Sequence, residues 1–351
     1  MTTPDDAAAI ARRHERHVET PHGRVYVTEI PGGDPPIVLM HGFPDDHRIY
    51  DKLLPRLSPR RAVAFDFAGY GRSDRNDGTH FSPEDHGAEI TAVLDALGID
   101  RAVLVGQDAS GPDAVAYSIA SPRRVARLVL LNTVFGHQPS LKWPEMTRLF
   151  ADPQLTTLAD DLVGDPSQLL WLLQRWGVQW QLDADDPEGI ARNSILPQFY
   201  GDDHQPDAIA SVRAWCARLH HTLDQQDALA GSGALSHLHV PVSIIWGKED
   251  RYLGPSLAAD APLFGGSHHY FDEEVRARQI GFYAGPRGRV LGIDPGVPHR
   301  IHVGEEGHVL DPQIGREEIG FAGPRLRQIA IDLVEDLFGL AFDILASIAG
   351  G

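Results

Sequence analysis

The chain has 351 residues, 42% of them hydrophobic and 23% charged, which is ordinary for a soluble globular protein with a large core. Its formal net charge of −18 argues against nucleic acid or an anionic membrane surface as the main partner. The single cysteine, Cys216, excludes a disulfide framework and a cysteine metal cluster within one chain.

The two ends of the chain predict an enzyme without a membrane anchor. Residues 1–20 lack the apolar stretch of a signal peptide, and no run of about 18 apolar residues occurs. The C-terminal stretch 333–351 is apolar, but its acidic residues and helical spacing favour a packed amphipathic helix over an anchor. We therefore expect a cytoplasmic location and no membrane partner.

Short apolar runs alternate with helical patterns, which predicts an α/β fold with a mostly parallel, twisted sheet flanked by helices. The first ribbon, residues 17–30, alternates apolar and polar residues around Pro21-His22-Gly23 and predicts an antiparallel hairpin at the sheet edge. The core strands are predicted at Pro36–His41, Ala62–Phe67, Ala102–Gln107, Leu128–Asn132 and Pro241–Gly247, and helices at Pro83–Leu97 and Pro112–Ser121.

Residues 133–238 differ from the rest, because their pattern is helical and contains no convincing strand. About a hundred residues between two core strands is too long for a simple crossover, so the sequence predicts an inserted helical cap. The predicted domains are an α/β core, residues 1–132 and 239–351, and a cap, residues 133–238. The cap tryptophans are Trp143, Trp171, Trp176, Trp180 and Trp215.

The most informative stretch is residues 103–111, Val-Leu-Val-Gly-Gln-Asp-Ala-Ser-Gly, where a buried strand runs into a turn and a helix. A nucleophile elbow requires small residues two positions before and after the nucleophile, because the turn leaves no room for side chains. Gly106, Ser110 and Gly111 satisfy this requirement around Asp108, whereas Ser110 itself lacks the flanking pattern. Asp108 is therefore the candidate nucleophile, and the alternative reading is a helix N-cap.

Two further motifs precede the elbow in order: His41-Gly42-Phe43-Pro44 after one strand, and the Gly-rich turn of residues 65–74 after the next. As an ordered set over about residues 17–255, the motifs resemble the α/β-hydrolase superfamily. The aspartate in the elbow is similar to the branch that holds epoxide hydrolases, haloalkane dehalogenases and haloacetate dehalogenases. The resemblance implies an α/β-hydrolase fold with an inserted helical lid, and an oxyanion hole made by the backbone N–H groups of Phe43 and Ala109.

The resemblance also implies a triad acid and a base. The acid is expected at Asp250, directly after the strand at 241–247, with Glu249 as the nearest competitor; the other family position is Asn132, which cannot serve as the acid. The base is expected at His308, which follows the predicted strand around Arg300. His268 or His269 is the competing choice, because both lie closer to Asp250 in the chain.

This set predicts a carboxylate that attacks a saturated carbon and forms an alkyl–enzyme ester, which a histidine-activated water then hydrolyses. The scheme needs no metal and no cofactor, and because the histidine must be neutral, activity should fall at acid pH. The partners are a small apolar substrate and water, and a homodimer is left open. The residues expected to line the substrate site are His41, Pro44, Gln107, Trp143, Trp176, Trp180 and Tyr252.

The leaving group distinguishes the activities. Ala109 offers no side-chain donor for a halide and no arginine for a carboxylate, which weakens both dehalogenase readings. An epoxide hydrolase needs a donor to the opening oxygen, which Tyr200 in the cap can supply, with Tyr252 as a second donor. The sequence therefore favours an epoxide hydrolase that makes a vicinal diol, with a haloalkane or haloacid dehalogenase as alternative. A catalytically silent ligand-binding protein of the same fold is the reading of another class, and ester or lactone hydrolysis also stays open.

Overall fold

The structure is a computed structural model in which part of the chain is described. The described residues are 12–51, 53–75, 80–165, 167–168, 171–172, 175, 207–247, 253–254, 257, 267–271, 280–284, 289–294 and 300–305. For residues 207–208, 246–247 and 267–305 the description concerns the backbone. Among the described residues, no helix is both long and apolar enough to cross a membrane.

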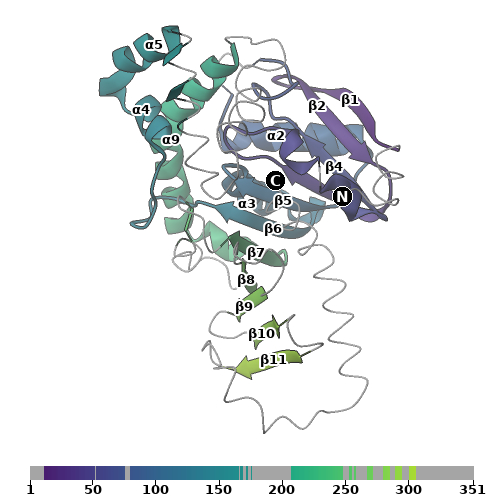
Figure 1. The fold of residues 1–351 in the computed structure, drawn as a ribbon. Helices are drawn as coiled ribbons and strands as arrows, with labels where there is room; N and C mark the ends of the chain where they lie inside the picture. The colour runs from purple at the N-terminus through teal and green to yellow at the C-terminus, as the bar shows by residue number, and fades with distance from the viewer. Residues whose placement is uncertain are drawn as a thin grey trace, which may run out of the picture.

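One sheet forms the centre of the molecule (Figure 1). Its described strands are β1 (His14–Thr20), β2 (Gly23–Ile30), β3 (Gly33–Met40), β4 (Arg60–Phe65), β5 (Ala102–Asp108), β6 (Val125–Thr133), β7 (Val242–Gly247), β8 (Ser267–Phe271), β9 (Ile280–Ala284), β10 (Arg289–Asp294) and β11 (Arg300–Glu305). They are ordered β1-β2-β4-β3-β5-β6-β7-β8-β9-β10-β11. The run from β4 to β8 is parallel, and antiparallel strands extend it at both edges.

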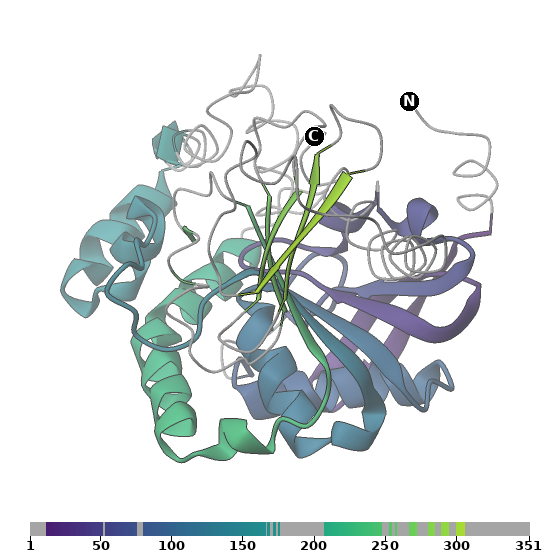
Figure 2. The same cartoon turned by 90° about the horizontal axis from the view of Figure 1, so that it is seen from below.

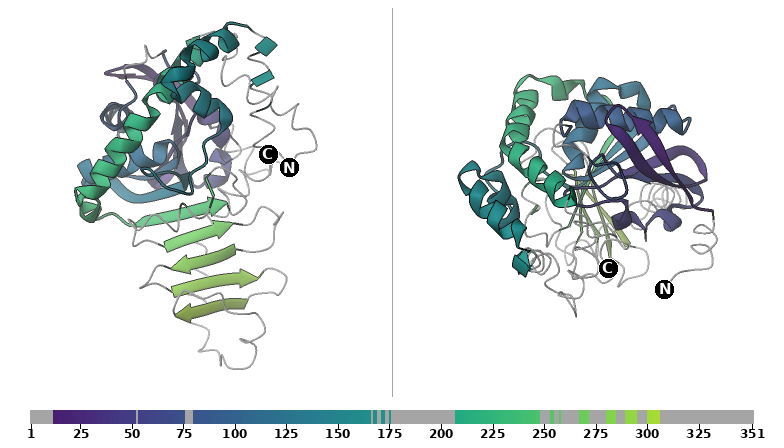
Figure 3. Two further views of the ribbon diagram at one scale, coloured as in Figure 1. Left: turned by 90° about the vertical axis from the view of Figure 1, so that its left-hand side faces the viewer. Right: turned by 90° about the horizontal axis from the view of Figure 1, so that it is seen from above.

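The predicted hairpin and all five predicted core strands are confirmed, with ends shifted by up to three residues. The sequence did not predict β8, β9 and β10, which lie in a stretch rich in glycine and proline. Beyond β7 these strands follow one another in a row (Figure 3, left). The strand expected near Arg300 is present as β11, at the opposite edge of the sheet from β1.

Helices alternate with the strands along the chain. The described ones are α2 (Pro83–Ala96), α3 (Ser110–Ala120), α4 (Glu145–Ala151), α5 (Thr156–Gly164) and α9 (Asp207–Gly231), with short 3-10 helices at His47–Tyr50, Leu54–Leu57, Pro122–Arg124, Pro153–Leu155 and Ala234–His237. Both helices predicted from the pattern, α2 and α3, are confirmed. In the stretch from 134 to 238, the described elements are all helical, and α9 packs against α4 (Figure 2).

The central strands are buried on both faces, which is why their sequences are almost continuously apolar. In β3, Val38 and Met40 belong to one hydrophobic cluster, whereas Ile37 and Leu39 belong to the cluster on the other face. All four side chains are fully buried. The two clusters pack against both faces of β3 and β5. The loops at the carboxyl ends of these strands are therefore held in fixed positions.

Candidate active site

Asp108 ends β5 and stands immediately before α3, in a backbone conformation with φ of 51°. A residue other than glycine in this left-handed region is strained by about 1–3 kcal/mol, and such strain clusters at functional sites. A Cβ at Gly106 would lie 2.9 Å from the Gly111 Cα, and a Cβ at Gly111 would overlap the Thr133 side chain. The tight packing predicted around position 108 is therefore present.

Two backbone amides hold one carboxylate oxygen of Asp108. Oδ1 accepts the N–H of Phe43 at 3.0 Å and the N–H of Ala109 at 2.6 Å. These are the two donors that the sequence predicts for an oxyanion hole, and they come from the loop after β3 and from the elbow itself. The arrangement places a carboxylate oxygen, rather than a serine hydroxyl, between the two donors.

The loop after β3 is fixed to the elbow by polar side chains. Gln107 Oε1 accepts the N–H of Gly42 at 2.9 Å. The His41 ring hydrogen-bonds the Gly42 carbonyl through Nδ1 at 2.8 Å, and its Nε2 accepts the N–H of Phe67 at 3.1 Å. Burial lowers the pKa of His41, so its ring is neutral. His41 and Gln107 were both predicted to contact substrate; these polar atoms hold the loop, and contact with substrate stays a prediction.

Hydroxyl groups complete the support of the elbow. Ser110 is buried, and its Oγ accepts the N–H of Gln107 at 2.9 Å and lies 2.9 Å from the Met40 carbonyl. This engagement agrees with the sequence argument against a serine nucleophile. Thr133 Oγ1 donates to the backbone carbonyl of Asp108 at 2.6 Å. Sequence reasoning missed Thr133, which lies 25 residues from its partner along the chain.

Behind the two oxyanion amides lies a cavity of about 10 Å³, which holds about one water-sized group. Its lining includes Phe43, Ala109, Tyr70 and His86. The Tyr70 hydroxyl and the His86 Nε2 are buried there without a hydrogen-bond partner in the described part of the chain. The sequence analysis did not single out either residue, because they come from the loop after β4 and from α2.

A buried ion pair orients the His86 ring toward this cavity. Nδ1 of His86 lies 2.7 Å from Oδ2 of Asp113 on α3. Burial of the ring opposes its protonation, but the Asp113 carboxylate outweighs this effect and raises the pKa of His86 to about 9. Burial also raises the pKa of Tyr70 well above its usual value, so its hydroxyl keeps its proton.

A tryptophan of α9 covers the oxyanion loop. The rings of Trp215 and Phe43 stack with centroids 4.0 Å apart and planes at 14°. The segment expected to form a cap therefore contacts Phe43, one of the two residues whose N–H groups hold the candidate nucleophile. Trp143, which was predicted to line the substrate site, is half-buried and packs against the main hydrophobic cluster. Pro44 is buried next to Phe43.

A second carboxyl group near Asp108, that of Asp45, has a raised pKa. Burial and the neighbouring carboxylates Asp108 and Asp46 raise the pKa of Asp45 to about 8. Asp45 is therefore mostly protonated at neutral pH. Protonation of Asp45 removes one of the carboxylate charges near Asp108.

Comparison with known proteins places the chain in a family. The family model for the alpha/beta hydrolase fold matches residues 35–261, which is more than half of the chain. The chain belongs to this family. The match begins within β3 and includes the oxyanion loop, the elbow and the segment that carries Trp215.

Individual relatives of this α/β hydrolase have several activities. Haloalkane dehalogenase 2 of Mycobacterium tuberculosis is 35% identical over 140 residues, which is 39% of this chain and 48% of that protein. The chain thus spans about half the length of this relative. A 2-hydroxy-6-oxononadienedioate/2-hydroxy-6-oxononatrienedioate hydrolase of Burkholderia vietnamiensis is 25% identical over 280 residues, covering 73% of this chain and 88% of that one. The structure of epoxide hydrolase A from Mycobacterium thermoresistibile matches with a TM-score of 0.52 and 22% identity, over 74% of this chain and 91% of that one.

Several residues predicted for the site of this α/β hydrolase lie outside the described residues. They are the acid Asp250 with its competitor Glu249, the base His308, the donor Tyr200, and the substrate-lining residues Trp176, Trp180 and Tyr252. Their roles stay predictions.

The strand order bears on the position of the base. Neighbouring strands lie about 4.8 Å apart, so β11 lies about 29 Å along the sheet from β5. His268 and His269 belong to β8, about 14 Å from β5, at the levels of Gly106 and Gln107. The described strands thus bring neither His268 nor His269 to Asp108, and the position of His308 stays a prediction.

Proposed function

We propose that this α/β hydrolase uses Asp108 as a nucleophile and hydrolyses an apolar epoxide to a vicinal diol. The observation that carries the proposal is the position of the Asp108 carboxylate, with Oδ1 bonded to the N–H groups of Phe43 and Ala109. A group held in this way is already where the carbonyl oxygen of an ester on Asp108 has to lie. Serine chemistry at this elbow is disfavoured, because Ser110 is buried and engaged with backbone groups.

The reaction proceeds in two steps. In the first, a carboxylate oxygen of Asp108 forms a bond to an epoxide carbon, the carbon–oxygen bond of the ring breaks, and the departing oxygen takes up the proton of a tyrosine hydroxyl. In the second, a histidine removes a proton from water, and the resulting hydroxide attacks the ester carbonyl carbon of Asp108. The tetrahedral oxyanion is held by Phe43 and Ala109, each N–H contributing about 3–4 kcal/mol. Collapse releases the diol and restores the carboxylate, and the proton held by the histidine returns to the tyrosine oxygen that protonated the departing oxygen.

The base and the enclosure of the substrate belong to the same proposal. The resemblance implies His308 as the base, oriented by Asp250. The helical segment 133–238 is proposed as a cap over the carboxyl ends of β3 and β5, where its Trp215 already contacts Phe43. A cap rich in aromatic residues suits a small apolar substrate. The scheme uses no metal or cofactor.

The choice of an epoxide rests on the cavity behind the oxyanion amides. An opening epoxide needs a donor for its oxygen, and the buried Tyr70 hydroxyl is such a donor, in the cavity lined by Phe43 and Ala109. Tyr70 therefore takes the role that the sequence analysis assigned to Tyr200, either alone or together with it.

Hydrolysis of a carbon–halogen bond is the second candidate. It is supported by the local identity of 35% to a haloalkane dehalogenase over 140 residues. In that reaction the leaving halide needs no proton, so a tyrosine hydroxyl contributes less. The same nucleophile and the same ester intermediate serve both reactions.

A Tyr70→Phe variant separates the two candidates. The variant should lower kcat for epoxides by about 100-fold, because the departing oxygen loses its donor, while any hydrolysis of alkyl bromides changes little. Diol formation and bromide release are measured on matched substrates. Tyr117→Phe is the control, because Tyr117 is an equally buried tyrosine that is not among the lining residues of the cavity.

Wild-type epoxide turnover by Tyr70→Phe would remove Tyr70 from the mechanism. Bromide release without any diol formation would favour the dehalogenase. Binding of substrates without turnover of either kind would favour the silent ligand-binding protein.

A further inference from the structure

The buried pair of His86 and Asp113 lies beside the candidate active site but takes part in neither step of the proposed reaction. Nδ1 of His86 on α2 lies 2.7 Å from Oδ2 of Asp113 on α3, and the two side chains are only 7% and 9% exposed. A buried ion pair is often no more stabilising than an apolar pair of similar volume, so stability alone is a weak reason for this one. What the pair can do depends on the second nitrogen of the His86 ring.

That second nitrogen, Nε2, faces the same cavity as the Tyr70 hydroxyl. His86 and Tyr70 both line the cavity of about 10 Å³ behind the amides of Phe43 and Ala109. Nε2 of His86 and the hydroxyl of Tyr70 are both buried, and neither has a hydrogen-bond partner within the described residues. Because the cavity holds about one water-sized group, these two atoms face one small volume.

The ring of His86 brings a positive charge to this cavity. Burial opposes protonation of the ring, but Asp113, and after it Glu89 and Asp85, outweigh burial and raise the pKa of His86 to about 9. His41 also lines the cavity, but burial lowers its pKa, so its ring is neutral. At neutral pH the N–H at Nε2 of His86 is therefore part of an imidazolium, whose charge is balanced by Asp113 on the far side of the ring.

Tyr70 on its own is a poor proton donor. Burial raises the pKa of its hydroxyl well above the usual value, and neighbouring acidic groups that include Asp113 and Asp108 add to this effect. When the hydroxyl gives its proton to the departing oxygen, a buried tyrosinate is left. A positive charge close to an acid favours its ionised form, and the His86 ring is placed to supply that charge.

We propose that the imidazolium of His86, held by Asp113, stabilises the tyrosinate that Tyr70 becomes when it protonates the departing oxygen of the epoxide. The inference rests on the proposed function and adds a positioning residue to it, since His86 acts through Tyr70. Tyr70 transfers its proton as the carbon–oxygen bond of the ring breaks, and His86 keeps its own proton throughout. The proton that the base histidine takes from water later returns to Tyr70, which restores the resting state.

The pH dependence of epoxide opening tests the proposal, because His86 loses its charge as the pH rises through about 9. Asp45 also titrates in this range, since its pKa is raised to about 8, so Asp45→Asn serves as the background for every variant. In this background the single-turnover rate of epoxide opening should fall about tenfold between about pH 8 and about pH 10.

Two variants test whether this fall belongs to His86. His86→Gln keeps an N–H donor without the charge, so it should lower the opening rate at about pH 7 by about 100-fold and abolish the fall at alkaline pH. Asp113→Asn leaves His86 in place and lowers its pKa, so the fall should begin about one pH unit lower or more. This second variant decides the question if His86→Gln does not fold.

A double variant separates this role from a purely structural one. His86→Gln added to Tyr70→Phe should lower the remaining rate by less than about threefold, because a phenylalanine forms no tyrosinate for His86 to stabilise. A structural role would instead give the same loss with and without the Tyr70 hydroxyl. An additive loss in the double variant would therefore overturn the proposal.

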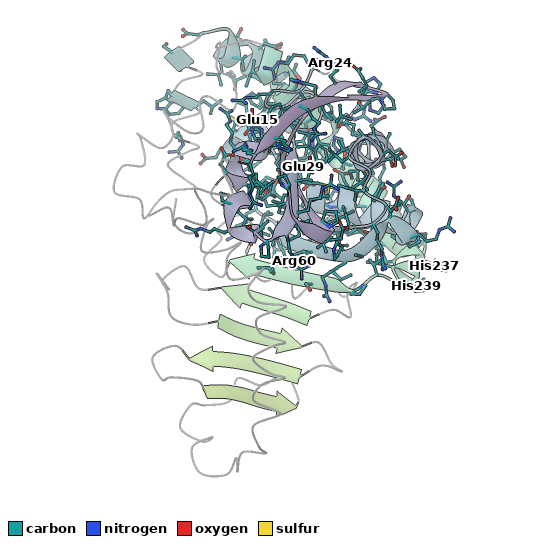
Figure 4. All side chains as sticks on the ribbon, turned by 90° about the vertical axis from the view of Figure 1, so that its right-hand side faces the viewer. Glu15, Arg24, Glu29, Arg60, His237 and His239 are labelled. Atoms are coloured by element: carbon teal, nitrogen blue, oxygen red, sulfur yellow. The ribbon has the colours of Figure 1, made fainter. Side chains whose placement is uncertain are left out.

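The matched control replaces two exposed histidines, His237→Gln together with His239→Gln. Their rings lie 6.3 Å apart at the surface before β7 (Figure 4), and neither residue lines the cavity. This variant should keep the rate and the pH profile of its background. A rate that stays level through pH 9, or a fall whose position Asp113→Asn does not change, would overturn the proposal and leave the proposed function intact. Absence of epoxide turnover by the wild type would instead overturn the proposed function, and this inference with it.

Discussion

Asp108→Asn should reduce kcat by at least about 10⁴-fold while the protein stays folded. The amide oxygen of asparagine can still accept the N–H groups of Phe43 and Ala109, and asparagine tolerates the positive φ of 51° at this position. What is lost is the negative charge that attacks the substrate carbon. The measurement is single-turnover product formation, together with a thermal melt that should differ from wild type by only a few degrees.

Asp45→Asn is the control for this variant. The pKa of Asp45 is raised to about 8, so at pH 6 the side chain is already neutral and the substitution removes no charge. Its kcat at pH 6 should stay within a few-fold of wild type. Asp108→Asn retaining a tenth of the wild-type rate, or Asp45→Asn losing as much as Asp108→Asn, would contradict the assignment of the nucleophile.

Gly42→Ala should damage both activity and stability. A Cβ at Gly42 would overlap the Cβ of Asp108 and lie 2.6 Å from Oε1 of Gln107. The loop must then move away from the elbow, which breaks the hydrogen bond from the Gly42 N–H to Gln107 Oε1 and displaces the Phe43 N–H. We expect kcat/KM to fall by about 100-fold or more, and the free energy of unfolding to fall by about 1–3 kcal/mol.

The control for Gly42→Ala is Gly164→Ala at the end of α5, where a Cβ meets no atom within 4 Å. This variant should have wild-type kcat/KM and an unfolding free energy within about 0.5 kcal/mol of wild type. Activity and urea unfolding are measured on both variants. A fully active Gly42→Ala would mean that the approach of this loop to Asp108 is not required.

The features predicted from the sequence are those that depend on short segments. Gly106, Asp108 and Gly111 identify the elbow because a tight turn restricts side-chain size locally. The donors Phe43 and Ala109 are backbone groups, so their positions follow once the loop and the elbow are recognised. The parallel strands were found for a similar reason, since burial on both faces leaves a continuous apolar run.

The features that were missed depend on contacts between distant segments. Tyr70 and His86 meet in one cavity only after β4, α2 and α3 have packed together. The hydrogen bonds by which His41 and Gln107 hold the loop were not foreseen, because a sequence does not say whether a polar atom faces a ligand or the backbone. The strands β8 to β10 are short and lie in a stretch rich in glycine and proline, so the turn residues masked the strand pattern.

The central claim is that water attacks the carboxyl carbon of Asp108 rather than the substrate. A single turnover in H₂¹⁸O, with enzyme in excess over epoxide, tests it directly by mass spectrometry of the product and of the peptide that contains Asp108. The account predicts that the first-turnover diol carries only ordinary oxygen and that one ¹⁸O appears in the Asp108 carboxylate. A diol that contains ¹⁸O, with an unlabelled Asp108 peptide, would show direct attack of water on the substrate and would contradict the nucleophile assignment.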